Sequence, residues 1–159
     1  MASGLEIEAD GQWPEALERL LRDLPEWFGI EESIVAYIRD AAALPSAAAA
    51  LDGEIVGVCT IRRHTPVAAE IEVLAVRRNL HRNGIGRKLL ERVEADLRAD
   101  GVELVQVKTF GPSGSSAEYE RTRAFYAALG YLPLEELTAL WGPENPCLIS
   151  VKPLRRAPW

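Results

Sequence analysis

The stretch from Ala69 to Leu90 constrains the fold more than any other part of the chain. It alternates as a strand does, passes through a turn that contains Gly84 and Gly86, and continues with apolar residues at helical spacing. The first N–H groups of a helix have no partner within the helix and carry partial positive charge. Glycines lack the Cβ atom that would keep a ligand away from those groups. The segment therefore predicts an anion site, such as one for a pyrophosphate, at the start of a helix.

The distribution of charge favours the same interpretation. Five cations and no acids lie between residues 77 and 88, so that, against a net charge of −6, the rest of the chain carries −11. These cations are Arg77, Arg78, Arg82, Arg87 and Lys88. A basic island on an acidic chain indicates a small polyanionic ligand, with a solvated cluster as the alternative. The overall acidity, with a pI near 5.0, argues against general binding to nucleic acid or to anionic membranes.

Two common phosphate loops do not fit these residues. A dinucleotide fingerprint needs a third glycine three residues after Gly86, and Leu89 stands there. A nucleoside-triphosphatase loop needs Gly-Lys-Ser/Thr at its end and a glycine five residues earlier. Here Gly86 is followed by Arg87, and the earlier glycine is missing.

Periodicity predicts the remaining elements. Alternation indicates strands, with an Asp-Gly hairpin at 52–53, and apolar residues three or four apart indicate helices. A capping pattern of Ser115 and Glu118 is expected to open the last helix, which ends near 129. The expected strands are 5–9, 46–51, 54–62, 69–77, 102–110, 131–141 and 146–154; the expected helices are 13–24, 31–44, 85–99 and 115–129. This order predicts one α/β or α+β domain over residues 1–159, a mixed sheet flanked by helices.

Composition narrows the compartment and the metal chemistry. Cys59 and Cys147 each lie in an apolar, strand-like run, which favours buried reduced thiols over a disulfide, a metal site or a nucleophile. Two histidines far apart argue against zinc. No run approaches the roughly 20 apolar residues that cross a bilayer, and no secretory signal is visible at the start. We therefore expect a cytoplasmic protein that binds neither metal nor membrane.

Two segments resemble the GNAT superfamily of N-acetyltransferases. His81-Arg82-Asn83-Gly84-Ile85-Gly86 is similar to the superfamily's Gln/Arg-x-x-Gly-x-Gly/Ala motif, with a histidine at the first position. Val-Leu-Ala-Val precedes it and Arg-Lys-Leu-Leu follows it. Arg-Ala-Phe-Tyr-Ala-Ala-Leu-Gly-Tyr at 123–131 resembles the superfamily's Phe-Tyr-x-x-x-Gly-Phe segment. The order of elements matches along roughly residues 5–154, and the chain is identified as a small, bacterial-type single-domain member.

The resemblance implies a GNAT fold and a reaction. The fold has a central, mixed, mostly antiparallel seven-stranded sheet whose fourth and fifth strands splay apart, flanked by about four helices. Acetyl-CoA is the expected co-substrate, without a metal, and its acetyl group passes to a primary amine of a small molecule or peptide by direct attack on the thioester. A non-catalytic acyl-CoA-binding regulatory module is the alternative. Homodimers are common in the superfamily.

Cofactor-binding residues carry over by position. Backbone groups of Leu74, Ala75 and Val76 are expected along the pantetheine arm. The pyrophosphate is expected to lie against Arg82, Asn83, Gly84, Ile85, Gly86 and Arg87. The superfamily often has an asparagine after the second splayed strand; this chain has none there, which leaves Ser113 or Ser115 as substitutes.

Catalysis needs a proton acceptor, because an amine with a pKa near 10.4 is almost fully protonated at pH 7. Glu70 and Glu72 lie two apart on the strand, so both project from one face. Glu72 is preferred for a small-molecule enzyme, while Glu70 matches the base of histone-type members. Their alternative role is as solvent-facing residues of an edge-exposed strand.

The resemblance also suggests Tyr126 as the proton donor to the leaving thiolate, with packing as the alternative and Tyr119 as the fallback. His81 is interpreted as a loop residue and His64 as a strand-end residue. The superfamily's acceptor site would lie near four aromatic residues, for which core packing is the simpler interpretation. These are Trp27, Phe28, Tyr37 and Trp141.

Overall fold

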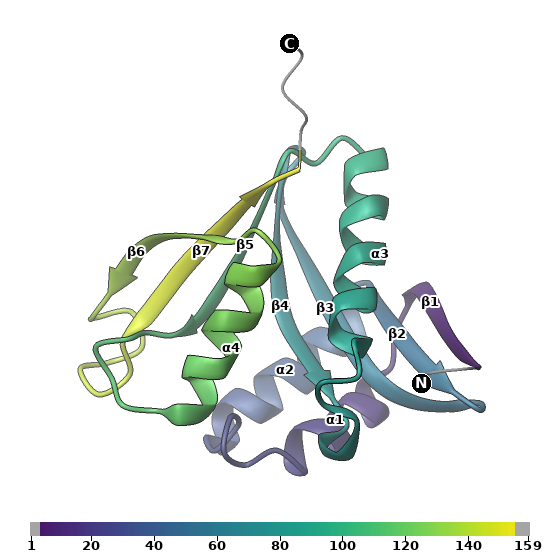
Figure 1. Cartoon of the computed structure of the whole chain (residues 1–159), viewed down its shortest axis with the longest axis horizontal. Coiled ribbons are helices and arrows are strands. Elements are labelled where there is room, and N and C mark those ends of the chain that lie inside the picture. Colours follow the sequence, from purple (N-terminus) through teal and green to yellow (C-terminus); the bar gives the residue numbers. More distant parts are fainter. Residues whose placement is uncertain (1–3, 155–159) are drawn as a thin grey trace. The chain divides into compact units, whose positions relative to one another are not determined.

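The computed structural model describes residues 4–154, and the element order within that range is the predicted one (Figure 1). A short 3-10 helix, η1 (Arg78–Leu80), is the single addition among the described elements. The strands are β1 (Leu5–Gly11), β2 (Ser46–Leu51), β3 (Glu54–Thr65), β4 (Ala68–Val76), β5 (Leu104–Phe110), β6 (Leu132–Leu137) and β7 (Cys147–Pro153). The helices are α1 (Pro14–Arg22), α2 (Glu31–Ala43), α3 (Ile85–Ala99) and α4 (Ala117–Ala128).

The seven strands form one sheet in the order β1-β2-β3-β4-β5-β7-β6. The pairs β1–β2, β2–β3, β5–β7 and β6–β7 are antiparallel, and β4–β5 is parallel. The carbonyl of Val67, just before β4, accepts hydrogen bonds from the amides of Glu103 and Leu104, so the two parallel strands begin side by side. The predicted mixed, mostly antiparallel sheet with four helices is confirmed.

The chain consists of two compact units. The first contains the residues up to Arg62 together with 71–100, and the second contains 63–70 and the residues from Gly101 onward. Strand β4 contributes its first three residues to the second unit and the others to the first. The single-domain organisation stays a prediction.

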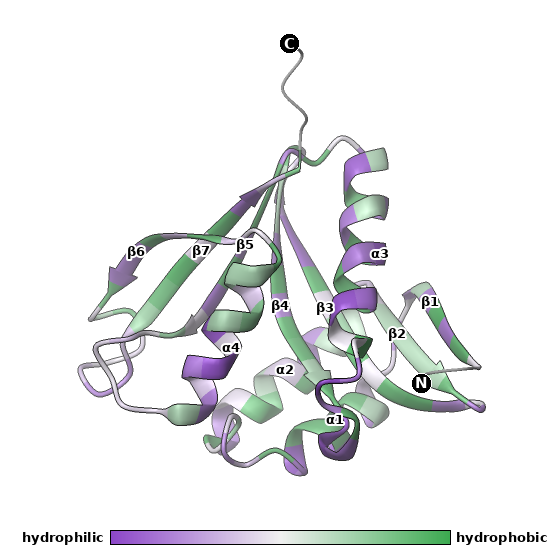
Figure 2. Cartoon of the chain, in the orientation of Figure 1, coloured by the Kyte–Doolittle hydropathy of each residue, from purple (hydrophilic) through white to green (hydrophobic). Residues whose placement is uncertain are grey.

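Helices α1 and α3 form the buried faces that the sequence predicts for the first unit. Proline at position 14 starts α1, since a helix tolerates proline in its first turn. Helix α3 has the predicted bounds, and hydrophobic and hydrophilic segments alternate along it in Figure 2. Its apolar buried residues are Ile85, Leu89, Leu90, Val93 and Leu97. This burial fixes the start of α3, and with it the preceding turn.

Two predicted details of the second unit are wrong. The residue that caps α4 is Ser116, not Ser115: its hydroxyl accepts from the amide of Tyr119 at 3.2 Å. Strand β6 ends at Leu137 because the chain then turns, with Gly142 at φ +90° bonded back to the carbonyl of Ala139.

Candidate active site

The turn before α3 has a left-handed backbone at two positions. Arg82 has φ +67° and Gly84, directly before the helix, has φ +78°. A Cβ atom built on Gly84 would meet nothing within 4 Å, so the space beside this residue is open. No side chain caps the helix at this end. The first turn of α3 therefore keeps its amide groups for another acceptor, which fits a phosphate.

Charge at this helix start is unusual for the molecule. Helices α1, α2 and α4 all have acidic residues in their first turn, whereas α3 has none. Instead it has the exposed cations Arg87 and Lys88. Cations near the positive end of a helix dipole destabilise the helix, typically by 0.3–1 kcal/mol each. A bound anion would relieve that repulsion.

Only part of the predicted basic island is available to a ligand. Arg77 forms an ion pair with Glu54. Arg78 pairs with Glu26 at 2.6 Å and donates to the carbonyl of Asp23 at 2.7 Å. The other three cations are exposed and form no ion pair with any residue in the described range 4–154: Arg82, Arg87 and Lys88. The sequence therefore overestimates the positive charge available to a ligand, because Glu54 and Glu26, which pair with Arg77 and Arg78, lie far from them in the sequence.

His81 holds the turn together. Its Nε2 lies 2.7 Å from the carbonyl oxygen of Val76 and must carry the hydrogen, since a carbonyl can only accept. The ring packs edge-on against Trp27, with centroids 5.6 Å apart. The side chain of Asn83 donates to the carbonyl of His81 at 3.1 Å. His81 therefore links the end of β4 to the loop through its side chain. The sequence predicts its place in the loop but not this structural role.

Glu72 belongs to a cluster of charged side chains in the first unit, with Arg62, Asp40 and Arg39, which pairs with Asp40 at 3.3 Å. Arg62 binds both of its oxygens, Nε to Oε1 at 3.0 Å and Nη2 to Oε2 at 3.1 Å, and also reaches Oδ2 of Asp40 at 3.1 Å. Burial raises the pKa of Glu72, opposed by Arg62, while the hydrogen bond with Glu72 lowers the pKa of Asp40. The two carboxyl groups therefore influence each other, and the shifts make Glu72 the weaker acid of the pair. Asp40 and Arg62 carry no spacing signal that could have identified them.

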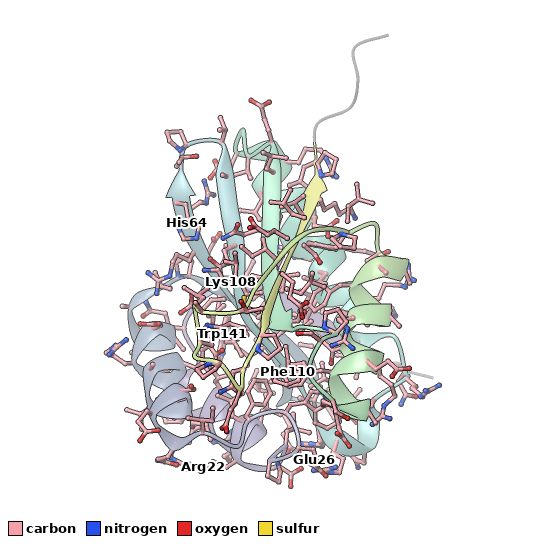
Figure 3. The ribbon with its side chains drawn as sticks, turned by 90° about the vertical axis from the view of Figure 1, so that its left-hand side faces the viewer. Arg22, Glu26, His64, Lys108, Phe110 and Trp141 are labelled. Atoms are coloured by element: carbon pink, nitrogen blue, oxygen red, sulfur yellow. The ribbon has the colours of Figure 1, made fainter. Side chains whose placement is uncertain are left out.

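Glu70 belongs to a separate cluster in the second unit. Its Oε1 accepts contacts from Nε2 of His64 at 2.6 Å, Nε2 of Gln106 at 3.0 Å and Nζ of Lys108 at 3.5 Å. Figure 3 labels His64 and Lys108. Glu70 is only 6% exposed, yet no residue in the described part of the chain donates to its Oε2. One oxygen of Glu70 thus takes all three contacts, and the other takes none from the described residues.

The alternative interpretation of these carboxylates as solvent-facing residues on an edge strand is wrong. Strand β4 lies between β3 and β5 in the sheet, and the side chain of Glu72 is 12% exposed. His64 lies near the end of β3, as its interpretation as a strand-end residue predicts, and its ring also contacts Glu70.

The candidate tyrosines lie on α4 among other aromatic rings. Tyr126 is buried, with ring centroids 5.1 Å from Phe125 and 5.3 Å from Tyr131. Tyr119 packs against Phe110 at 5.7 Å. These contacts account for packing, and a proton-donor role for Tyr126 remains a prediction.

Other expected site residues have local partners. Trp27, Phe28 and Tyr37 pack against the core of the first unit, as the packing interpretation predicts. Trp141, in the second unit, is 40% exposed. The hydroxyl of Ser113 donates to Glu136 at 2.9 Å, so the proposed substitute for the missing asparagine is already engaged.

The described residues contain neither a metal-binding cluster nor a membrane-spanning helix. No group of three or more His, Cys, Asp or Glu side chains there could hold a metal ion. None of the helices between residues 4 and 154 is long and apolar enough to span a bilayer. Cys59 and Cys147 are buried, free thiols.

Comparisons with known proteins agree with this geometry. A match of 35% identity over 105 residues, 66% of this chain, relates it to an uncharacterized N-acetyltransferase of Chlorobaculum tepidum, of which it spans 57%. An aminoglycoside 6'-N-acetyltransferase complexed with coenzyme A has the same fold, with a TM-score of 0.77 at 19% identity over 97% of this chain and 99% of that one. The ribosomal-protein-S18-alanine N-acetyltransferase of Escherichia coli gives 0.73 at 16% identity, over 96% of each chain. The model of the Acetyltransferase (GNAT) family matches residues 9–131, and the chain belongs to that family.

Proposed function

We propose that this protein transfers the acetyl group of acetyl-CoA to a primary amine of a small molecule or peptide. The observation that carries the proposal is the start of α3, where an uncapped first turn, an open glycine and three unpaired cations meet in the described structure. A helix start of this kind stabilises a diphosphate. The same features would serve a non-catalytic acyl-CoA-binding module, and the carboxylates and tyrosine favour the enzyme.

Residues of the first unit would hold the cofactor. The amides of the turn at 82–87, with Arg82 and Arg87, bind the pyrophosphate, and the backbone of Leu74, Ala75 and Val76 binds the pantetheine arm. His81 supports this arrangement because it ties the end of β4 to the turn. Acetyl-CoA supplies an activated thioester carbonyl to the amine.

Glu70 is our candidate for the proton acceptor. Three contacts converge on its Oε1, and its Oε2 has no donor among the described residues. Glu72 has both oxygens engaged by Arg62, so its proton-accepting positions are occupied. The raised pKa of Glu72 keeps it as the second candidate, since a general base works best when its pKa lies near the working pH.

The reaction also needs a second group that donates a proton to the leaving thiolate. Tyr126 is assigned this role by its place in the Phe-Tyr segment, and its burial would keep the donated proton from competing water. Tyr126→Phe removes the hydroxyl but retains the ring packing, so a loss of kcat without loss of stability would support the assignment.

A panel of amines and peptides, assayed for release of free coenzyme A, tests the proposed function. Turnover in the wild type and an approximately 100-fold or greater loss in Glu70→Gln, with coenzyme A binding retained by calorimetry, is the expected result. Glu72→Gln is the matched comparison on the same strand. Coenzyme A binding with no turnover on any amine would favour the non-catalytic module, and no binding at millimolar concentration would overturn both.

The proposed acceptor is a primary amine that belongs to a small molecule or to a peptide. The two named structural relatives act, by their names, on an aminoglycoside and on an alanine of ribosomal protein S18. A shared fold therefore spans small-molecule and peptide acceptors. Both classes belong in the panel.

A further inference from the structure

One buried hydroxyl group on β5 has no hydrogen-bond partner within the chain. Thr109, the residue before the end of that strand, is 5% exposed. Its Oγ1 is the one fully buried side-chain oxygen or nitrogen in the described residues 4–154 that forms no hydrogen bond. An unpaired buried hydroxyl costs stability, and a valine would fill much the same space without that cost. The hydroxyl therefore indicates a partner that the polypeptide itself does not supply.

Other hydroxyl groups of the chain are satisfied. Thr60, a buried strand residue like Thr109, lies with its Oγ1 3.0 Å from the hydroxyl oxygen of Ser46. In the loop after β5, the hydroxyl of Ser113 donates to Glu136 at 2.9 Å. The unpaired hydroxyl of Thr109 is thus a local feature of the end of β5.

Strand register places Thr109 on the side of β5 where Tyr126 lies. Side chains alternate between the two faces of a strand, and opposite residues of an antiparallel pair share a face. Thr109 therefore shares its face with Val105 and with Lys152, which is opposite Val105 on β7. The ammonium of Lys152 lies 5.7 Å from the ring centre of Tyr131, and the rings of Tyr131 and Tyr126 contact each other at 5.3 Å.

Helix α4 is also bound to the strand end beside Thr109. Nη1 of Arg123 donates to the carbonyl of Phe110, the residue after Thr109, at 2.5 Å. Figure 3 labels Phe110. Arg123 and Tyr126 are three positions apart on the helix, so they lie on the same side of it. This contact holds the end of β5 against the part of α4 that carries Tyr126.

We propose that the hydroxyl of Thr109 forms a hydrogen bond with the pantetheine arm of the bound cofactor. This role rests on the proposed function, in which Tyr126 donates a proton to the sulfur at the end of that arm. A short ethyl spacer separates the sulfur from the nearest amide of the arm. Thr109, on the same side of β5 as Tyr126, is therefore placed for that amide.

The chemistry of the hydroxyl fits an amide. A hydroxyl group can donate to the amide carbonyl or accept from the amide N–H. A single buried hydroxyl suits a neutral group better than a phosphate, because a buried charge needs several donors or a counter-charge. Thr109 transfers no proton in this role and positions the arm.

Thr109→Val removes the hydroxyl with little change in shape. The melting temperature of the ligand-free protein should stay the same or rise, because the lost hydroxyl had no partner. Thr60→Val is the matched control. It should lower the melting temperature, since Ser46 then loses its partner, and it should leave coenzyme A affinity unchanged.

Calorimetry with two ligands locates the lost hydrogen bond. Coenzyme A has the pantetheine arm, and its nucleotide portion, 3'-phospho-ADP, lacks it. We expect Thr109→Val to raise Kd for coenzyme A about 3- to 10-fold, as for one neutral hydrogen bond, and to leave Kd for 3'-phospho-ADP unchanged. Thr109→Ser and Thr109→Ala provide a second comparison that does not depend on how valine packs. Both lose the methyl group, and serine, which keeps the hydroxyl, should bind coenzyme A more tightly by a similar factor.

The outcomes separate this role of Thr109 from the proposed function. Unchanged coenzyme A affinity in Thr109→Val would overturn the role, and so would an equal loss for coenzyme A and 3'-phospho-ADP. A melting temperature lowered as far as in Thr60→Val would also overturn it, because the hydroxyl would then have a partner in the ligand-free protein. Turnover of an amine by the wild type would leave the acetyltransferase intact in each case. Absence of coenzyme A binding by the wild type would instead remove the proposed function.

Discussion

Replacing Gly84 by alanine should weaken coenzyme A binding far more than replacing Gly101. The two glycines flank the same helix, α3, at opposite ends. Their φ values are +78° and +89°, and an added Cβ atom would meet nothing within 4 Å at either position. They therefore differ mainly in whether a ligand is expected beside them.

The cost in stability should be nearly the same for both variants. A left-handed backbone conformation disfavours an L-residue by about 1–2 kcal/mol. Alanine is the better probe than valine, because a β-branched side chain at positive φ is strained further. Thermal unfolding should show similar decreases in melting temperature for Gly84→Ala and Gly101→Ala.

The binding cost should differ. A new methyl group at Gly84 enters the open space beside the first amides of α3 and displaces a phosphate oxygen from at least one of them. A hydrogen bond to a charged group contributes about 1.5–3 kcal/mol, so its loss raises Kd roughly 10- to 150-fold. Calorimetry with coenzyme A measures this directly. Equal affinities for Gly84→Ala and Gly101→Ala would refute the assignment of the turn.

Three further predictions concern charge and burial. Arg87→Glu should stabilise the ligand-free protein by about 0.3–1 kcal/mol while weakening coenzyme A binding; Arg92→Gln, on the same helix, should leave the affinity unchanged, and denaturant titration with calorimetry tests both. Cys59 and Cys147 should resist a thiol reagent at pH 8 in the folded protein and react on unfolding, because burial raises both pKa values, that of Cys59 to about 12; rapid native labelling would contradict this. Arg62→Met should destabilise the fold by about 1–2 kcal/mol, because Glu72 and Asp40 then face each other without the cation that binds both. The loss should grow as pH rises above 4.5, since removing Arg62 raises the pKa of Glu72 further in the folded state; a pH-independent difference in unfolding free energy would speak against this coupling.

Local pattern predicted the elements well where one segment encodes them. Helix α3 has its predicted bounds because its apolar face, the glycine before it and the glycine after it all lie within one stretch of sequence. The prediction made β6 too long, ending it at 141 instead of Leu137. Leu140 and Trp141 continue the apolar pattern, although the backbone turns there. Apolar character marks a strand only when burial follows it, and both residues are largely exposed.

Side-chain partners were the part that sequence could not supply. Asp40 reaches Arg62 across 22 positions, and Glu70 reaches Gln106 across 36. Such pairs depend on strand register and on how a helix rotates over the sheet, which hydrophobic periodicity leaves undetermined. For that reason the sequence could not show that Arg62 binds both oxygens of Glu72, whereas three side chains contact a single oxygen of Glu70.

The candidate site is assembled from groups that lower the stability of the ligand-free fold. The first turn of α3 has cations where α1, α2 and α4 have acids, and Gly84 provides neither a side-chain cap nor a Cβ atom. The chain has the stabilising alternatives at other helices: a serine caps α4, and glutamates occupy the first turn of α2. Features that a stability-optimised sequence would remove persist where a diphosphate would stabilise them, so coenzyme A binding should raise the melting temperature by more than the stabilising substitution at Arg87 does.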